Sequence, residues 1–162
     1  MLKGHDILVL SDDWGRHQFS CQHIVERLLP FNRVLWVNTI GFRTIKLNRY
    51  DIRRALEKMQ SWIRAKPARG NTVNPISNLH IINPVCLPFG GRKAVRLFND
   101  LSVRHSIREQ TLHLGIKNSI LITTLPTAAG VTGTLGECLS VYYCVDDTSL
   151  WPGNDGDLMR WL

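Results

Sequence analysis

Five short runs of apolar residues recur along the chain, and polar, glycine or proline residues bound each of them. Apolar runs of this length are typical of strands buried in a parallel sheet. The predicted strands cover residues 6–10, 33–38, 79–83, 119–123 and 139–145. The last of them, like the others, is expected to be buried.

Helical periodicity fills most of the intervals between these runs. Residues 19–29 place apolar side chains on one stripe, and residues 93–114 carry a partly apolar face followed by Gly115, a residue that commonly ends helices. The stripe consists of Cys21, Ile24, Val25, Leu28 and Leu29. The longer helix has Val95, Phe98, Leu101, Val103, Ile107 and Leu112. Shorter helical pieces are predicted over 127–135 and from residue 155 onward.

The alternation of strands and helices predicts the fold class. We expect an α/β, Rossmann-like parallel sheet of about five or more strands with helices on both faces. Crossovers between its strands should be right-handed. In such a sheet a ligand binds beyond the carboxyl ends of the strands, so these ends are where chemistry is expected.

The composition narrows the class of protein further. The chain has 162 residues, of which 44% are hydrophobic and 20% charged, values that fit one globular domain over 1–162. No run of apolar residues is long enough to span a membrane, and the N-terminus does not resemble a signal peptide. We therefore expect a cytoplasmic protein. Its four cysteines have no C-x-x-C spacing, which indicates buried, reduced thiols.

The net charge of +7 comes from one segment. Residues 43–69 hold nine basic residues and two acids, so the rest of the chain is balanced. Within this segment residues 51–65 predict an amphipathic helix whose polar side is mostly basic. Such a helix is either an ordinary packing helix or a surface for anionic lipid or phosphate. The residues of that surface would be Arg49, Arg53, Arg54, Lys58 and Trp62.

Nucleic acid is not an expected partner, because the chain has no zinc finger and no aromatic-interleaved strand of the RNA-recognition type. A membrane surface fits the basic segment better. The protein would then be peripheral at the inner face of the membrane.

The first predicted strand is followed by a loop rich in functional groups. Asp12, Asp13, Trp14, Gly15 and His17 lie within six residues, just before a helix begins. The carboxylates and the imidazole are suited to removing a proton from a hydroxyl group. The alternative is that the acids cap the turn and His17 is simply exposed.

Two further strand ends carry polar groups. Thr124 follows the fourth strand, and Asp146 and Asp147 follow the fifth. These acids are candidates for a base, for contacts to sugar hydroxyls or for capping the loop. Nothing in their spacing requires a metal, so none is expected. The sequence also lacks the glycine-rich dinucleotide and P-loop motifs and the G-x-S-x-G nucleophile motif.

Three stretches together resemble the N-terminal domain of GT-B glycosyltransferases, in particular bacterial group-1, family-4-like enzymes that build cell-surface polysaccharides. They are DILVLSDDWGRHQFSCQHIVERL (6–28), RVLWVNTIGFR (33–43) and VYYCVDDTSLWPG (141–153). The resemblance implies one half of a two-domain fold. This N-terminal half binds a saccharide or lipid-linked acceptor, and a C-terminal domain outside this chain holds the nucleotide-sugar donor. No cofactor is expected in this chain.

The resemblance also assigns roles to individual residues. Asp13 and His17 would orient or deprotonate the acceptor hydroxyl, and Arg43 would meet a phosphate. The remaining acceptor-side residues in the resemblance would be Trp14, Gly15, Gly41, Asp146 and Asp147, and their positions at strand ends add Asp12 and Thr124 to the acceptor side. We expect hexosyl transfer only when the donor domain is joined. The alternative is a non-catalytic Rossmann-like module that docks on a membrane or partner. The sequence does not predict the donor sugar, the acceptor, the stereochemistry or the oligomeric state.

Overall fold

The computed structural model describes residues 2–16, 19–38, 77–87 and 93–147. Within them five strands form one parallel sheet in the order β3-β2-β1-β4-β5. The strands are β1 (Asp6–Ser11), β2 (Arg33–Asn38), β3 (Leu79–Ile82), β4 (Ile120–Thr123) and β5 (Leu139–Tyr142). This all-parallel sheet with helices confirms the predicted α/β, Rossmann-like fold class.

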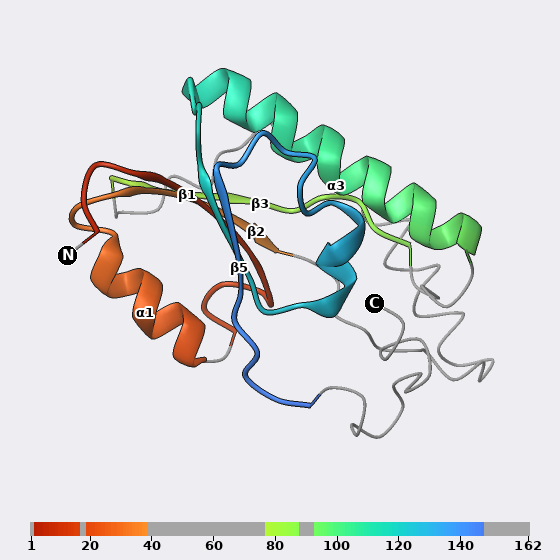
Figure 1. Ribbon diagram of the computed structural model, residues 1–162, viewed down its shortest axis with the longest axis horizontal. Coiled ribbons are helices and arrows are strands. Elements are labelled where there is room, and N and C mark those ends of the chain that lie inside the picture. Colours follow the sequence, from red (N-terminus) through yellow and green to blue (C-terminus); the bar gives the residue numbers. More distant parts are fainter. Residues whose placement is uncertain (1, 17–18, 39–76, 88–92, 148–162) are drawn as a thin grey trace.

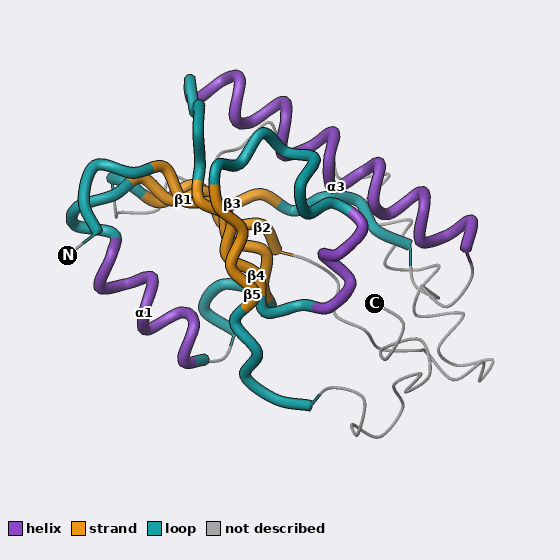
Figure 2. The backbone as a smooth tube through the Cα atoms, in the orientation of Figure 1, coloured by secondary structure: helices purple, strands orange, loops and turns teal. Residues whose placement is uncertain are grey.

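Helices cover both faces of the sheet, as predicted. Figures 1 and 2 show α1 (Ser20–Leu28) and α3 (Lys93–Leu114) on opposite sides of it. Alternate residues of the strands point to opposite faces. On one face Ile7, Val9 and Trp36 pack with Cys21 and Val25 of α1. On the other face the cluster contains Leu8, Leu10, Leu121 and, from α3, Val103 and Ile107.

The buried side of α1 differs in part from the predicted stripe. Cys21, Val25 and Leu29 are buried at a spacing of four residues, but Ile24 is 44% exposed. Gln22 is buried instead. A polar side chain can be buried when it is hydrogen-bonded, and Gln22 hydrogen-bonds to Gly15 and Glu26.

The predicted bounds of α3 are confirmed, but its predicted apolar face is wrong in part. Val103 and Ile107 are buried, whereas Phe98, Leu101 and Leu112 are exposed. Residues two positions apart lie about 200° apart around an α-helix, so Leu101 cannot share the face of Val103. Gly115 ends the helix with a positive φ of 64°, and the amides of Gly115 and Ile116 donate to the carbonyls of Leu112 and Thr111.

The C-terminal part of the described chain corrects three further predictions. The helical piece expected over 127–135 is a short 3₁₀ helix, η1 (Pro126–Gly130). The expectation that the last strand is buried is wrong: β5 lies at one edge of the sheet and is exposed at every residue, and neither of the two core clusters contains a β5 residue. Cys21 and Cys86 are buried free thiols as expected, but Cys138 and Cys144 are exposed.

Two residues, Arg33 and Asn32, tie the amino end of the sheet together. The Arg33 guanidinium donates to both Asp6 carboxylate oxygens, at 2.7 and 2.9 Å, and to the Leu114 carbonyl at the end of α3. Asn32 donates to the carbonyls of Leu2 and Leu28.

Among the helices that the structure describes, none has the length and apolar character needed to cross a membrane.

Candidate functional site at the carboxyl end of the sheet

The strand order reverses direction between β1 and β4, and in open parallel sheets this reversal is where ligands bind. Hydroxyl groups join the two strand ends at this point. Ser11 Oγ lies 2.8 Å from Thr124 Oγ1, and Thr123 Oγ1 donates to the Leu10 carbonyl at 3.1 Å. The predicted site residue Thr124 is therefore located at the reversal, directly opposite the end of β1.

The loop that leaves β1 is anchored by side chains from two neighbouring elements. Trp36 Nε1 of β2 donates to the Asp12 carbonyl at 3.0 Å, and Asn38 Oδ1 accepts from the Trp14 amide at 2.9 Å. Gln22 Oε1 of α1 accepts from the Gly15 amide at 3.2 Å. Gly15 has a φ of 76°, a conformation that glycine adopts without strain. Three hydrogen bonds thus fix the backbone from Asp12 to Gly15.

The side chain of Trp14 in this loop forms an aromatic pair with Trp36 of β2. The rings of Trp14 and Trp36 meet edge to face, with centroids 4.7 Å apart and planes inclined by 75°. Trp36 is buried, while Trp14 is partly exposed. Edge-to-face contact is a favoured geometry for aromatic rings. The loop therefore presents part of an indole to solvent from a fixed position.

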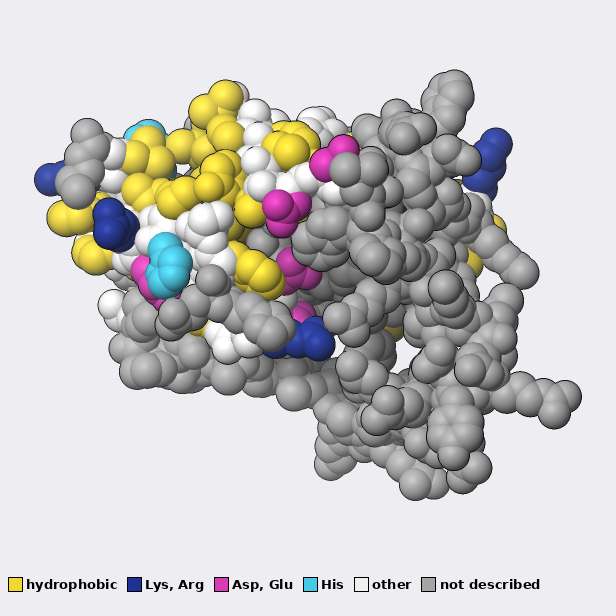
Figure 3. All heavy atoms as spheres, turned by 90° about the horizontal axis from the view of Figure 1, so that it is seen from below, with side chains coloured by type: hydrophobic (Ala, Val, Ile, Leu, Met, Phe, Trp, Pro, Cys, Tyr) yellow, Lys and Arg dark blue, Asp and Glu magenta, His cyan; other side chains and the backbone are white. Residues whose placement is uncertain are grey.

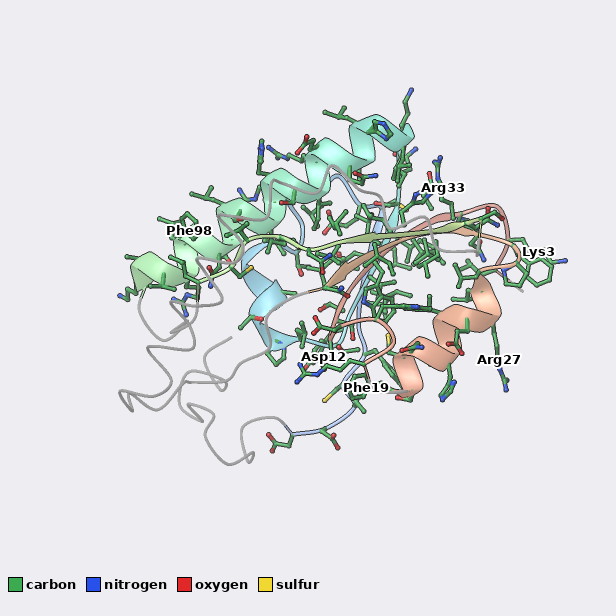
Figure 4. All side chains as sticks on the ribbon, turned by 180° about the vertical axis from the view of Figure 1, so that it is seen from behind. Lys3, Asp12, Phe19, Arg27, Arg33 and Phe98 are labelled. Carbon is green, nitrogen blue, oxygen red and sulfur yellow. The ribbon has the colours of Figure 1, made fainter. Side chains whose placement is uncertain are left out.

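Acidic groups accompany the indole. Asp12 and Asp13 are both partly exposed, and an Asp13 oxygen lies 3.6 Å from the Arg16 guanidinium. Figure 4 shows Asp12 and Phe19 at the carboxyl end of the sheet, and Lys3 and Arg33 at the opposite end. Figure 3 shows acidic side chains gathered in the middle of the face viewed from below. Carboxylates accept hydrogen bonds, so this loop is suited to hydroxyl or cationic groups.

The end of β5 contributes a second group of polar side chains. Tyr143 donates its hydroxyl to Ser20 Oγ at 3.3 Å, which links this strand end to the start of α1. Burial, a hydrogen bond with Cys144 and the charge of Asp147 together raise the pKa of Tyr142. Asp146 and Asp147 are exposed and follow in a segment that leads away from the sheet (Figure 1).

Several predicted site residues lie outside the described residues and remain predictions. They are His17, Gly41, Arg43 and the proposed anion surface of Arg49, Arg53, Arg54, Lys58 and Trp62. Among the residues that the structure describes, no group of three or more His, Cys, Asp or Glu side chains is arranged to hold a metal ion.

The anchoring residues were not predicted as part of the site. Asn38 ends β2, and its Nδ2 donates to Asn83 Oδ1 beyond the end of β3 at 2.8 Å. Asn38 and Asn83 could have been identified from their positions, since each is a polar residue at the carboxyl end of an apolar strand. Gln22 has a weaker signal, a polar residue next to the apolar stripe of α1.

The arrangement resembles the ligand edge of a nucleotide-binding fold in topology but differs in chemistry. In dinucleotide-binding folds the first strand-to-helix turn offers free amides to a pyrophosphate. Here side-chain oxygens occupy the amides of Trp14 and Gly15, and two carboxylates are adjacent. Comparisons with protein-family models, with curated proteins and with solved structures find no match. A function must therefore be inferred from the fold class and from the chemistry of this edge of the sheet.

Proposed function

We propose that this chain is the acceptor-binding domain of a sugar-nucleotide-dependent glycosyltransferase acting in cell-surface polysaccharide or glycolipid synthesis. The observation that supports this most is the anchored loop from Asp12 to Gly15, which combines two carboxylates with a partly exposed indole. Carboxylates accept hydrogen bonds from sugar hydroxyls, and an indole face packs against the apolar face of a pyranose ring. The resemblance to GT-B enzymes that we infer from residues 6–28, 33–43 and 141–153 points to the same function.

Asp13 is our candidate for orienting or deprotonating the acceptor hydroxyl. Its carboxylate is partly exposed, so a hydroxyl group can approach it. The Arg16 guanidinium lies 3.6 Å from one of its oxygens. In the reaction the acceptor oxygen forms the new glycosidic bond, its proton goes to the base, and the nucleoside diphosphate leaves with the electrons of the broken bond. The donor would be held by a C-terminal domain of the GT-B fold outside this chain.

Binding of neutral saccharides tests the proposal without the donor domain. Titration of the chain with a panel of neutral disaccharides, followed by tryptophan fluorescence, should give saturable binding to at least one member. Trp14→Ala and Asp13→Asn should each weaken that binding about five- to 150-fold, because a lost stacking surface or charged acceptor each costs about 1–3 kcal/mol. Arg27→Ala is the matched control, because Arg27 lies at the far end of α1 (Figure 4).

The opposite pattern would contradict the proposal. If no disaccharide binds, or if Trp14→Ala and Asp13→Asn bind as tightly as the control variant, the loop does not hold the acceptor. Turnover of this domain joined to a nucleotide-sugar-binding domain then tests Asp13 and His17 as catalytic residues. Unchanged turnover in both alanine variants would remove their assigned role.

One observation favours the alternative function, a module that docks on a partner without catalysis. The edge strand β5 exposes Leu139, Val141 and Tyr142, and the run from Cys138 to Val145 holds no charged residue. Sheet edges of this kind are usually paired or protected by charges.

Membrane docking is tested separately by co-sedimentation with vesicles containing phosphatidylserine. Salt-sensitive binding lost on replacing Arg53, Arg54 and Lys58 by Gln would support it.

A further inference from the structure

The β1 loop owes its conformation to side chains that belong to neither the loop nor the predicted acceptor site. Asn38 Oδ1 accepts from the Trp14 amide, and Gln22 Oε1 accepts from the Gly15 amide. Both residues have a second partner that fixes the orientation of the amide group. Asn38 donates to Asn83 Oδ1 at 2.8 Å, and Gln22 donates to Glu26 Oε1 at 2.9 Å.

These contacts form a continuous support from β3 to α1. Asn83 holds Asn38, Asn38 holds the amide of Trp14, and Gln22 holds the next amide from the helix side. Gln22 is only 5% exposed although it is polar, and burying its amide is unfavourable unless its hydrogen bonds are made. The acidic side chains of Asp12 and Asp13 stand on the backbone that this support fixes.

We propose that Asn38 and Gln22 are positioning residues that preorganise the Asp12–Gly15 loop for a neutral, hydroxyl-bearing ligand. By accepting hydrogen bonds from the Trp14 and Gly15 amides, they also make these two amides unavailable to a phosphate group. This inference rests on the proposed acceptor function for the class of ligand. Binding groups must be held within a fraction of an ångström to contribute fully, and supporting hydrogen bonds provide that precision. An amide that already donates to a side-chain oxygen is not available to a phosphate oxygen.

A matched pair of variants separates the hydrogen bond from the space that Asn38 fills. Asn38→Leu keeps the size of the side chain but removes the acceptor for the Trp14 amide. Asn38→Asp keeps an oxygen at the same position, and the Asn83 amide can rotate to donate to it. Gln22→Met removes the acceptor for the Gly15 amide. Asn78→Leu is the control, because Asn78 donates to the Leu29 carbonyl near the opposite end of the sheet.

Amide hydrogen exchange at Trp14 and Gly15, measured by NMR, tests the positioning directly. Asn38→Leu should speed exchange at Trp14 by about five- to tenfold, which corresponds to the loss of about 1 kcal/mol. Gln22→Met should do the same at Gly15, while Asn38→Asp and Asn78→Leu leave both rates near those of the wild type. The near-ultraviolet circular dichroism of the Trp14–Trp36 pair should change in step with exchange.

Binding then decides whether the positioning serves a ligand. With the disaccharide that binds the wild type, Asn38→Leu and Gln22→Met should weaken binding about five- to tenfold, and Asn38→Asp should restore it. Inorganic pyrophosphate should not shift the NMR signals of the Trp14 and Gly15 amides in the wild type. Unchanged exchange at Trp14 in Asn38→Leu, unchanged disaccharide affinity in that variant, or pyrophosphate-induced shifts at the Trp14 and Gly15 amides would each overturn the proposal.

The same data distinguish this inference from the proposed function. If the wild type binds no disaccharide, the acceptor function is contradicted, and the neutral ligand class inferred for the loop fails with it. The exchange rates would still decide whether Asn38 and Gln22 fix the loop. If the wild type binds a disaccharide but neither variant weakens it, the acceptor function stands and the positioning role fails.

Discussion

Trp36→Phe is the substitution that most directly connects the core of the sheet to the site. Trp36 is 1% exposed on the face covered by α1, its Nε1 donates to the Asp12 carbonyl at 3.0 Å, and its ring meets Trp14 at 4.7 Å. Phenylalanine keeps an aromatic ring in the core but has no donor for the Asp12 carbonyl. We expect both the stability of the fold and the position of the loop to change.

The magnitude follows from two contributions. A lost hydrogen bond costs about 0.5–1.5 kcal/mol in free energy of unfolding. The smaller ring leaves a void in a closely packed cluster, and this costs about 1–2 kcal/mol. The free energy of unfolding measured in urea should therefore be about 1.5–3.5 kcal/mol lower in the variant. For a chain of this length that corresponds to a melting temperature lower by roughly 3–14 °C.

Trp14→Phe is the matched control for this experiment. Its ring is partly exposed, and its backbone amide still donates to Asn38 whatever the side chain. It should lose less than about 1 kcal/mol, mostly from the aromatic contact. If Trp36→Phe unfolds within about 0.5 kcal/mol of the wild type, the buried indole does not hold the loop and our account of the site's support is wrong.

Three other predictions concern single residues. Burial raises the pKa of Cys21 to about 11, so at pH 8 iodoacetamide should modify the exposed Cys138 and Cys144 well before Cys21. Mass spectrometry of the digested protein checks this order of labelling, and early labelling of Cys21 would contradict it. Burial and the charges of Arg33 and His113 lower the pKa of His80, so the folded state binds fewer protons than the unfolded state and stability should fall as the pH drops below about 6.5. Urea unfolding at pH 7 and pH 5 should show this loss, and His80→Gln should reduce it; equal pH sensitivity in both proteins would refute the assignment. Gly115→Ala should destabilise the fold by about 1 kcal/mol, because the residue has a φ of 64° at the end of α3, whereas Ser102→Ala within the helix should change thermal stability much less.

The sheet was predictable because its strands are apolar on both faces. Residues 33–38 and 93–114 match the observed bounds of β2 and α3, and the other strands differ from prediction by only a few residues at their ends. Exposure was harder to predict. The run at Leu139–Tyr142 forms an exposed strand, and its place at one edge of the sheet depends on the strand order, which no local pattern reports.

The candidate site was predictable only for residues whose chemistry is local. Asp12, Asp13 and Trp14 are identified by following a buried strand, whereas the roles of Gln22 and Asn38 depend on contacts with a loop elsewhere in the chain. Thr124 was a weak candidate by itself. Its contact with Ser11 arises because the sheet places β4 beside β1, although more than a hundred residues separate them in sequence.

We propose that the loop after β1 binds a neutral saccharide. Titrating the isotopically labelled chain with neutral disaccharides, and separately with inorganic pyrophosphate, tests it at the level of individual amides. We expect saturable shifts at the amides of Trp14, Gly15 and Thr124 with a disaccharide and none at these amides with pyrophosphate. Shifts at these amides with pyrophosphate alone, or disaccharide shifts confined to other parts of the chain, would contradict it.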